Sequence, residues 1–382
     1  MQRIVIGGGM SGMVTALCSA RAGHRTVLLE RNNRLGRKVA MTGNGRCNIG
    51  NINCDYSCYN GSGLDEFVFD SVDVKECVDF LNSVGIFTFA DDEGRIYPIT
   101  ESSNSVVDCL RYALQRAGVE VVCDCTVKEV VKQSDGFAVI CSDKRRYADD
   151  VVVAIGSGSQ AEMPFVKGIE DFYTALCPSL VPLKVNNMDK ALNGIRVKCN
   201  VRLLKDGNVA AEEKGELLFR EYGLSGICAF DLSAVIARRT VKGDKSDYGV
   251  LCDLVPHMPY DMLVTVIKSR LDSRCGREEL LYGIVHNKIA QHVLKRVDGL
   301  CAEKIARVLK NCLYSVSLIR DYGKSQVTSG GLDGKYCPRL RLPNGIGAVG
   351  EVLDVDGKCG GYNLMFAIAS ALTYCKLYNG EV

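Results

Sequence analysis

The fold is decided by Arg3-Ile4-Val5-Ile6, which runs into Gly7-Gly8-Gly9-Met10-Ser11-Gly12, then a helical stretch, then Thr26-Val27-Leu28-Leu29-Glu30. A strand, a glycine-rich turn, a helix and a second strand form a βαβ nucleotide-binding unit. Gly7 lets the chain leave the strand, Gly9 lets backbone N–H groups approach a pyrophosphate, and Gly12 lets the helix pack closely. The helix N-terminus should therefore face the phosphates of a nucleotide.

Glu30 ends the second strand, about 20 residues beyond the glycine turn, as the dinucleotide fingerprint requires. A carboxylate there can accept hydrogen bonds from both ribose hydroxyls and would repel a 2′-phosphate. The sequence thus predicts an adenine dinucleotide without that phosphate. The choice between FAD and NAD stays open on these residues alone.

The length of 382 residues predicts two or three domains, and a hydrophobic content of 47% allows a large core. The net charge is +2, from 47 basic and 45 acidic residues, which gives no general attraction to nucleic acid or anionic membranes. The basic runs Lys144-Arg145-Arg146 and Arg238-Arg239 are interpreted as solvated loop faces.

The first strand begins almost at Met1, which leaves no room for a signal peptide, and no apolar run reaches transmembrane length. We therefore expect a cytoplasmic protein. Of the oligomeric state the sequence says nothing.

The 19 cysteines are scattered and include no C-x-x-C pair, so we expect reduced thiols packed as small hydrophobic groups. This argues against disulfide reductases of the glutathione or thioredoxin reductase kind. Cys123-x-Cys125 and Cys54-x-x-x-Cys58 lack a second pair at zinc-finger spacing, so no metal site is expected. His286 and His292 would lie on different faces of a helix and are interpreted as incidental.

Residues 31–51 are polar, contain glycine and lack periodicity, which predicts a loop that follows a ligand. The loop ends in Met41-Thr42-Gly43-Asn44-Gly45-Arg46-Cys47-Asn48. Its basic residues Arg37, Lys38 and Arg46 favour contact with the pyrophosphate end.

Helical spacing predicts amphipathic helices over residues 73–84 and 105–117, the second opened by a capping box from Ser105 to Asp108. Short strands are expected over 119–123, 126–132 and 137–141, partly as a small meander, and an apolar strand from Asp150 ends at Gly156. This order, ending in Ala154-Ile155-Gly156, resembles FAD-binding flavoproteins of the two-dinucleotide-fold type, in which that glycine approaches the cofactor.

From residue 183 alternating faces predict a β-rich insert, with strands over 195–203, 215–219 and 226–233 and a loop over 222–226. Residues 261–311 become charged and helical, with a further helix over 302–313, and 314–319 alternate again. The expected domains are 1–182 with 326–382 for the nucleotide, 183–258 with 314–325 for a β-barrel-like insert, and 259–313 for a helical subdomain.

The closing stretch Ala348-Val349-Gly350-Glu351-Val352-Leu353-Asp354-Val355-Asp356-Gly357 leads to a helix opening at Gly361. A carboxylate just beyond a strand can bond ribityl or ribose hydroxyls. The helix N-terminus would aim its positive end at a group that gains negative charge, such as flavin N1 and O2. Asp354 and Asp356 lack the further ligands of a calcium loop.

With these stretches the chain resembles, from end to end, the bacterial FAD-binding oxidoreductases of the BaiN and YhiN type, also known as the aminoacetone oxidase family. The loops Gly45-Arg46-Cys47-Asn48 and Gly350 to Gly357 are the specific matches, and they favour FAD over NAD. Further matching pieces are Gly36-Arg37-Lys38, Ser179-Leu180-Val181-Pro182-Leu183, Gly215-Glu216-Leu217-Leu218-Phe219, Gly223-Leu224-Ser225-Gly226 and Val327-Thr328-Ser329-Gly330-Gly331.

The resemblance implies an α/β fold: a split Rossmann-like FAD-binding domain with an inserted small β-barrel and helical subdomain. Together with the glycine fingerprint it implies a cofactor-binding set: Gly7, Gly9, Met10, Ser11, Gly12, Glu30, Arg31, Lys38, Thr42, Gly43, Gly45, Arg46, Cys47, Asn48, a backbone contact near Val127, Gly156, Gly350, Glu351, Gly361, Tyr362, Asn363 and Leu364. Cys47 is read as a packing or hydrogen-bonding residue, because a lone thiol has no resolving partner.

Some members of this family are thought to reduce unsaturated oxo-steroids with reduced nicotinamide. We therefore expect an FAD-dependent oxidoreductase acting on a small hydrophobic or unsaturated oxo substrate held between the FAD domain and the insert. NADH or NADPH would bind transiently, since only one dinucleotide fingerprint is present. Open alternatives are an oxygen-dependent amine or amino-ketone oxidase, a non-catalytic flavin-binding regulator, and a flavoprotein acting on RNA, which the balanced charge disfavours.

The chain departs from the family in two places. Relatives carry Ala-Thr-Gly-Gly and then Gly-Ser-x-Gly-Asp-Gly, whereas here Ala154-Ile155-Gly156-Ser157-Gly158 leads to Ala161-Glu162-Met163-Pro164-Phe165. Relatives also carry Thr-Met-Glu-Ser-Lys where this chain has Tyr336-Cys337-Pro338-Arg339-Leu340. Both changes would alter the pocket over the flavin, and the sequence assigns no catalytic acid or base.

Overall fold

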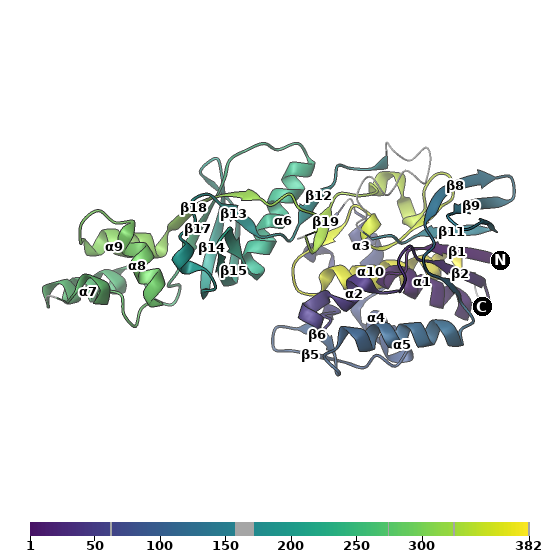
Figure 1. The fold of residues 1–382 in the computed structure, drawn as a ribbon, viewed down its shortest axis with the longest axis horizontal. Coiled ribbons are helices and arrows are strands. Elements are labelled where there is room, and N and C mark those ends of the chain that lie inside the picture. Colours follow the sequence, from purple (N-terminus) through teal and green to yellow (C-terminus); the bar gives the residue numbers. More distant parts are fainter. Residues whose placement is uncertain (62, 157–171, 274, 324, 381–382) are drawn as a thin grey trace. The chain divides into compact units, whose positions relative to one another are not determined.

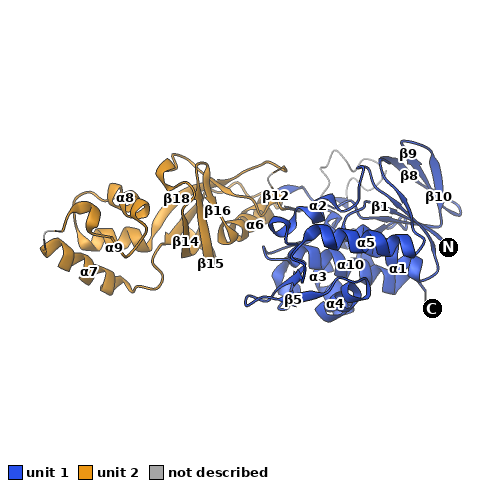
Figure 2. Cartoon of the chain, turned by 60° about the horizontal axis from the view of Figure 1, so that its bottom comes forward, with its two compact units in different colours: residues 1–177, 327–382 blue, residues 178–326 orange. Residues whose placement is uncertain are grey.

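The computed structural model describes residues 1–61, 63–156, 172–273, 275–323 and 325–380. The chain divides into two compact units, Met1–Cys177 with Val327–Val382, and Pro178–Gln326 (Figure 2). The first unit therefore uses both ends of the chain, and the second is one continuous insertion.

A five-stranded parallel sheet forms the centre of the first unit, in the order β20-β11-β1-β2-β7. Ile4 lies opposite Val27 on one side and Val151 on the other, and all three side chains are buried. Such apolar strands are expected where both faces of a parallel sheet are covered. The strands are β1 (Gln2–Ile6), β2 (Arg25–Leu29), β7 (Glu120–Val122), β11 (Asp150–Val153) and β20 (Gly347–Ala348).

Helices pack around this sheet, and α10 runs beside α1 within the unit (Figure 1). Almost every residue of α10 from Met365 to Cys375 is buried, so it is a core helix rather than a surface one. The predicted helix over 73–84 is α4, whose N-cap Asp73 forms a capping box with Glu76. The helices of the unit are α1 (Met10–Arg21), α2 (Arg37–Ala40), α3 (Leu64–Ser71), α4 (Val74–Ser83), α5 (Ser103–Arg116) and α10 (Tyr362–Tyr378).

Smaller sheets complete this part of the chain. An antiparallel meander has the order β10-β9-β8, and the other two have the orders β3-β6-β5 and β21-β4. Their strands are β3 (Gly50–Asn51), β4 (Tyr59–Asn60), β5 (Thr88–Ala90), β6 (Arg95–Pro98), β8 (Val127–Gln133), β9 (Gly136–Cys141), β10 (Arg145–Ala148) and β21 (Asp356–Gly357). The short strands β12 (Cys177–Ser179) and β19 (Val327–Ser329) lie where the chain passes between units.

The second unit is a closed barrel with the order β13-β16-β15-β14-β17-β18 and its own hydrophobic core. Among the described residues of this unit four helices accompany the barrel, of which α7, α8 and α9 are grouped together at one end of it (Figure 1). The strands are β13 (Leu183–Val185), β14 (Arg196–Lys205), β15 (Asn208–Arg220), β16 (Gly223–Ser225), β17 (Tyr248–Asp253) and β18 (Cys312–Leu318). The helices are α6 (Ile227–Val241), α7 (Tyr260–Asp272), α8 (Asn287–Lys295) and α9 (Ala302–Lys310).

The predicted fold class, a Rossmann-like domain with an inserted barrel and helices, is confirmed by this topology. The strand predicted over 226–233 is wrong, because the chain forms helix α6 there. Cys228, Leu232 and Ile236 repeat at helical spacing and are buried, a period that only becomes visible when the stretch is followed beyond 233. Arg238 and Arg239 belong to the same helix and are half-buried, not loop residues.

Three further local predictions are corrected. The second helix begins at Ser103, so the capping box at Ser105 is wrong, and the Ser105 hydroxyl instead donates to the Ser102 carbonyl. The stretch at 144–146 is not a solvated loop, because Arg145 starts β10 and Arg146 is buried. The final helix of the insert ends at Lys310, and β18 follows from Cys312.

Among the described residues, no helix combines the length and the apolar character needed to cross a lipid bilayer.

Candidate nucleotide-binding site

The glycine-rich turn is packed tightly behind and open in front. The Gly7 N–H donates to the Leu29 carbonyl at 2.8 Å, and a Cβ at Gly7 would overlap the Ala154 carbonyl. A Cβ at Gly12 would overlap the Gly7 carbonyl, so α1 sits as close to β1 as the predicted fingerprint requires. At Gly9 a Cβ would meet no atom of the described residues within 4 Å, which leaves space in front of the turn.

Helix α1 begins at Met10 with Gly9 as its N-cap, and no described side chain caps it. The first N–H groups of a helix have no acceptor within that helix, and they carry its positive end. Open space at Gly9 and uncapped donors behind it form an anion-binding arrangement. Met10 and Ser11, both predicted cofactor contacts, are buried in this first turn.

Glu30 is nearly buried, with 8% of its surface exposed. Its Oε2 accepts a hydrogen bond from the Gly8 N–H at 2.7 Å, and its Oε1 accepts one from the Asn32 N–H at 2.8 Å. The Asn32 side-chain amide also donates to Oε1, so Oε2 is the oxygen that keeps a lone pair for a ribose hydroxyl. Arg31 is exposed, and the Arg37 guanidinium donates to the Asn32 side chain rather than towards the glycine turn.

The loop over 42–48 is held by its own backbone. Gly43, Asn44, Gly45 and Cys47 all have left-handed φ angles, and the Cys47 N–H donates to the Thr42 carbonyl at 3.2 Å. Burial raises the pKa of the Cys47 thiol to about 11, although a hydrogen bond with Thr42 acts in the opposite direction. The thiol is therefore protonated at neutral pH, which favours packing over nucleophilic chemistry.

Arg46 faces a different set of groups. Its guanidinium lies 4.5 Å from the centre of the Tyr97 ring and is paired with Glu101. The side chain is about half exposed, at 49%. Contact between Arg46 and a pyrophosphate would therefore need this pair to exchange for a phosphate.

The closing segment meets the glycine turn and the 42–48 loop. The Gly350 N–H donates to the Ser370 hydroxyl at 3.0 Å, and a Cβ at Gly350 would overlap the Ser11 side chain. Glu351 accepts from the Thr328 N–H at 3.2 Å through Oε1, and its Oε2 lies 3.6 Å from Lys38 Nζ.

Gly156 lies against this same ion pair. A Cβ at Gly156 would stand 3.6 Å from Glu351 Oε2 and 3.8 Å from Lys38 Nζ. Residues 38, 156 and 351, far apart in sequence, are thus brought together.

Helix α10 begins at Tyr362, directly after Gly361, as predicted. Gly361 has a φ of 98°, and a Cβ there would overlap Asn48 Oδ1 and the Gly50 backbone. No described side chain caps this helix either. Asn363 holds the preceding loop in place. Its Oδ1 accepts from the Gly357 N–H at 2.8 Å, and its Nδ2 donates to the Gly357 carbonyl at 3.0 Å.

Val127, another predicted contact, lies at the start of β8. It is connected to the site through the chain, since the Cys125 N–H donates to the Glu30 carbonyl at 2.9 Å. Of the residues that hold the site, Asn32, Thr328 and Ser370 were not among the predicted ones. Thr328 lies in a stretch that matched the family, whereas Asn32 and Ser370 carry no sequence signal.

The two departures from the family pattern can be placed only in part. Residues 157–165 lie outside the described part of the chain. The second departure forms two 3-10 turns, Gly334–Tyr336 and Pro338–Leu340, in which Cys337 and Leu340 are buried. This stretch therefore contributes to the core of the first unit.

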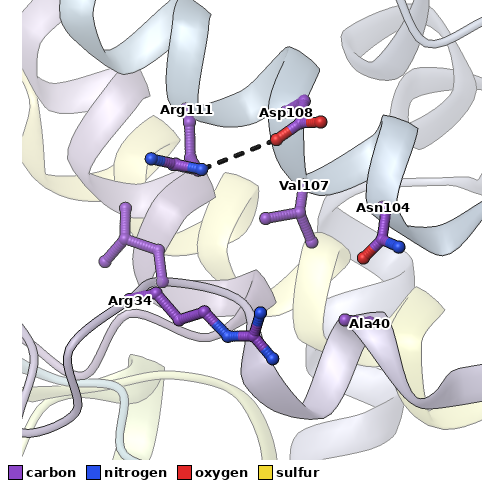
Figure 3. A pocket seen from close by; sticks show the side chains of 7 residues that line it. Arg34, Ala40, Asn104, Val107, Asp108 and Arg111 are labelled. Atoms are coloured by element: carbon purple, nitrogen blue, oxygen red, sulfur yellow. Dashed lines mark ion pairs between the residues drawn. The ribbon is translucent and has the colours of Figure 1, made fainter.

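Two hollows occur away from these residues. One, of about 320 Å³, lies beside α2 and α5 and is lined by Arg34 and by the Asp108–Arg111 ion pair of 3.6 Å (Figure 3). The other, of about 860 Å³, lies in the second unit and mixes the cations Arg202, Lys214 and Lys310 with Glu212, Glu213 and Asp253. None of the predicted cofactor-binding residues lines either hollow.

Comparison with known proteins assigns the chain to a family. The family described as HI0933-like protein Rossmann domain matches residues 1–376. The chain belongs to this family. A 3-dehydro-bile acid delta(4,6)-reductase from Clostridium scindens is 31% identical to it, over 97% of each chain. Ribosomal RNA dihydrouridine synthases are 25% identical: that of Haemophilus influenzae over 97% of this chain and 96% of its own, and that of Escherichia coli over 96% and 95%.

The resemblance drawn from the sequence motifs is thereby confirmed, and the HI0933-like chain is an FAD-dependent oxidoreductase, as predicted. One observation tests whether its residues suit FAD. Asn48 Oδ1 is buried and has no hydrogen-bond donor among the described residues, although buried acceptors are normally paired. It lies at the start of α10, where no described side chain caps the helix, so an unpaired acceptor beside the positive end of a helix fits a polar ligand such as a flavin ring.

Proposed function

We propose that this protein catalyses the NAD(P)H-dependent reduction of a carbon–carbon double bond conjugated to a carbonyl, in a small and largely apolar substrate. The observation that carries the proposal is the 31% identity, over 97% of each chain, with a 3-dehydro-bile acid delta(4,6)-reductase. Bound FAD would supply the two-electron chemistry.

The chain's own contribution is binding and charge stabilisation. The start of α1 and the open space at Gly9 would hold the pyrophosphate, and Glu30 would hold the ribose. The positive end of α10 would stabilise negative charge that develops in front of Gly361. The buried Asn48 oxygen would orient a donor of the ligand at the same place.

The decisive experiment follows the flavin absorbance of the purified protein without oxygen. We expect NADH or NADPH to bleach it within seconds to minutes, and a steroid carrying a conjugated enone to restore it. The matched control is a saturated 3-oxo steroid, which should leave the reduced spectrum unchanged. Equal reoxidation by both steroids would contradict the proposed bond specificity.

The identity of the donor is tested separately from the reaction. If neither nicotinamide bleaches the flavin, the protein can be reduced with dithionite and given the enone. Reoxidation by the enone would then support the enone reductase activity and exclude NADH and NADPH as its electron donors. Bleaching by an amine, with peroxide released in air, would instead support the oxidase alternative. Firmly bound FAD with no turnover from any donor would support a regulator.

A second candidate is reduction of uridine in RNA, favoured by the two dihydrouridine synthases among the relatives. The same class of reaction would apply, because the double bond of uracil is also conjugated to a carbonyl. The overall net charge of +2 and the mixed charges of the hollow in the second unit disfavour a long polyanion. Supplying the reduced protein with unmodified ribosomal RNA instead of a steroid enone distinguishes the two substrates.

A further inference from the structure

Three metal-ligating side chains meet at the meander of the first unit. The Cys125 and Cys141 sulfurs and a carboxylate oxygen of Asp143 all lie within 4.8 Å of one another. Cys125 lies between β7 and β8, Cys141 ends β9, and Asp143 lies in the turn towards β10. Both thiols are buried and the carboxylate is exposed, so the cluster has one side open to solvent.

Backbone hydrogen bonds fix the chain at Cys125, at Cys141 and at Ser142 beside Asp143. The Ser142 N–H donates to the Thr126 carbonyl at 2.8 Å, and the Cys141 N–H donates to the Lys144 carbonyl at 3.0 Å. The Cys125 N–H donates to the Glu30 carbonyl. The ligands are therefore presented by a preformed hairpin rather than gathered from flexible loops.

Arg146 stands behind the cluster. Its guanidinium donates to both oxygens of Asp143 at 2.8 Å and lies 3.8 Å from the Cys125 sulfur. Its side chain is 8% exposed, and its Nε has no acceptor among the described residues. A group that hydrogen-bonds a ligating carboxylate and orients it is a usual companion of a metal site.

We propose that Cys125, Cys141 and Asp143 bind one thiophilic divalent cation of the zinc type, with solvent as the fourth ligand. Tetrahedral zinc takes sulfur at about 2.3 Å and carboxylate oxygen at about 2.0–2.2 Å, which places neighbouring ligand atoms about 3.5–4 Å apart. The two sulfurs and the carboxylate oxygen would reach this geometry with movements of about 1 Å from their observed positions. One carboxylate oxygen would turn to the metal while Arg146 keeps the other.

The charges balance in this arrangement. Binding releases two thiol protons to solvent and leaves two thiolates, one carboxylate, one dication and the Arg146 cation, which sum to zero. The cysteine spacing alone predicts no metal site, because Cys123-x-Cys125 has no second cysteine pair. The partner ligands come instead from Cys141-x-Asp143, brought alongside by the pairing of β8 with β9.

The test uses the full-length, FAD-loaded protein kept reduced, and Zn²⁺ as the probe. We expect wild type to bind one more zinc ion per chain than the Cys125→Ser/Cys141→Ser variant, by titration calorimetry and by metal content after dialysis. Co²⁺ should give thiolate charge-transfer absorption that this variant lacks. Cys123→Ser, two residues away and half-buried, is the matched control and should bind as wild type does.

Loss of the two buried thiols could disturb folding, so Asp143→Asn provides a second variant with an exposed change. It should weaken zinc binding at least tenfold and leave the far-ultraviolet circular dichroism unchanged. Equal zinc content in wild type and in the double-serine variant would overturn the proposal, as would the absence of tight zinc binding by wild type.

Discussion

At the scale of single residues, Gly9 and Gly12 lie in one turn but have different surroundings. Gly12→Ala would force a methyl group into the Gly7 carbonyl, whereas Gly9→Ala would place it in open space at an ordinary φ of −79°. We expect Gly12→Ala to destabilise the protein by about 1–3 kcal/mol through overpacking and to prevent FAD binding. Urea unfolding and FAD content measure both effects.

Gly9→Ala is the informative partner of that variant. The apoprotein should unfold at the same urea concentration as wild type, while FAD affinity should fall at least tenfold because the methyl group occupies the space left for the ligand. Unchanged FAD affinity would show that the pyrophosphate does not approach Gly9.

His292 is a buried residue of the second unit that sequence spacing left without a role. Its Nδ1 lies 3.1 Å from Asp189 Oδ2 and its Nε2 lies 3.1 Å from the Tyr314 hydroxyl. Burial lowers the pKa of His292 below its ordinary value of 6.5, with Arg296 and Lys295 acting in the same direction and Asp189 opposing them. His286, by contrast, caps the start of α8 from an exposed position.

The lowered pKa of His292 predicts that the stability of the folded protein depends on pH. As pH falls through 6.5 the unfolded chain takes up a proton at residue 292, whereas folded His292 resists, so stability present above 6.5 is lost below it. His292→Gln should therefore reduce the fall in urea midpoint between pH 7 and pH 5. His286→Gln, an exposed substitution at the start of the same helix that leaves the contacts of His292 in place, is the control. Parallel slopes for all three proteins would reject the assignment to His292.

The residues that sequence could predict are those with a strict local requirement. Gly7, Gly12 and Glu30 follow from a fingerprint whose spacing is set by a turn and two strands. Ser370 holds Gly350 from the middle of an apolar helix, and Asn32 holds Glu30 from a loop. Such partners depend on tertiary placement, and a hydroxyl or amide in those positions has no distinctive pattern.

At the scale of elements, a buried ion pair joins β1 to β11. The Asp150 carboxylate accepts from Arg3 Nε at 2.7 Å, from the Arg341 guanidinium at 2.9 Å and from the Tyr374 hydroxyl at 2.9 Å. The Arg3 side chain has no exposed surface and that of Asp150 has 5%. The pairing of two central strands thus includes a charge that cannot reach water.

Asp150→Asn should destabilise the first unit by about 3–5 kcal/mol, because the buried Arg3 charge loses its counter-ion. Asp79→Asn is the control: it removes an exposed pair with Lys75 on α4 and should leave the urea midpoint unchanged. Midpoints followed by flavin fluorescence compare the two. Similar small shifts for both would contradict the argument that Arg3 depends on Asp150 as its counter-ion.

Two elements were missed for different reasons. Over 226–233 only the first two turns of α6 are visible, and eight residues do not separate a helical period from an alternating one. The strand β10 was missed because its basic residues suggested a solvent-exposed loop. In the structure Arg146 pairs with Asp143 and is buried by its neighbours in the meander. A charged side chain was therefore expected to be exposed to solvent, although its counter-ion allows it to be buried.

At the scale of the whole molecule, the two units have separate hydrophobic cores. Residues 178–326 form a closed barrel with its own helices and should fold when produced alone. Cooperative thermal unfolding and dispersed amide resonances would establish this. A molten product would show that the insert needs the first unit in order to fold.

In the full chain, FAD should raise the melting temperature of one transition only. A ligand at 100 times its dissociation constant adds about 2.7 kcal/mol to the state that binds it. All predicted FAD-binding residues lie in the first unit, so the barrel transition should stay in place. Equal shifts in both transitions would show that the units unfold together.

The first unit is assembled from the beginning and the end of the chain, with β20 completing its sheet and α10 packing on α1. During synthesis the glycine turn therefore leaves the ribosome long before its final partners. The barrel can fold during this time, while the apolar face of α1 stays uncovered until α10 has been synthesised. A nascent chain should acquire FAD only after α10 has left the ribosome, and premature termination anywhere before α10 should yield a colourless, chaperone-dependent product.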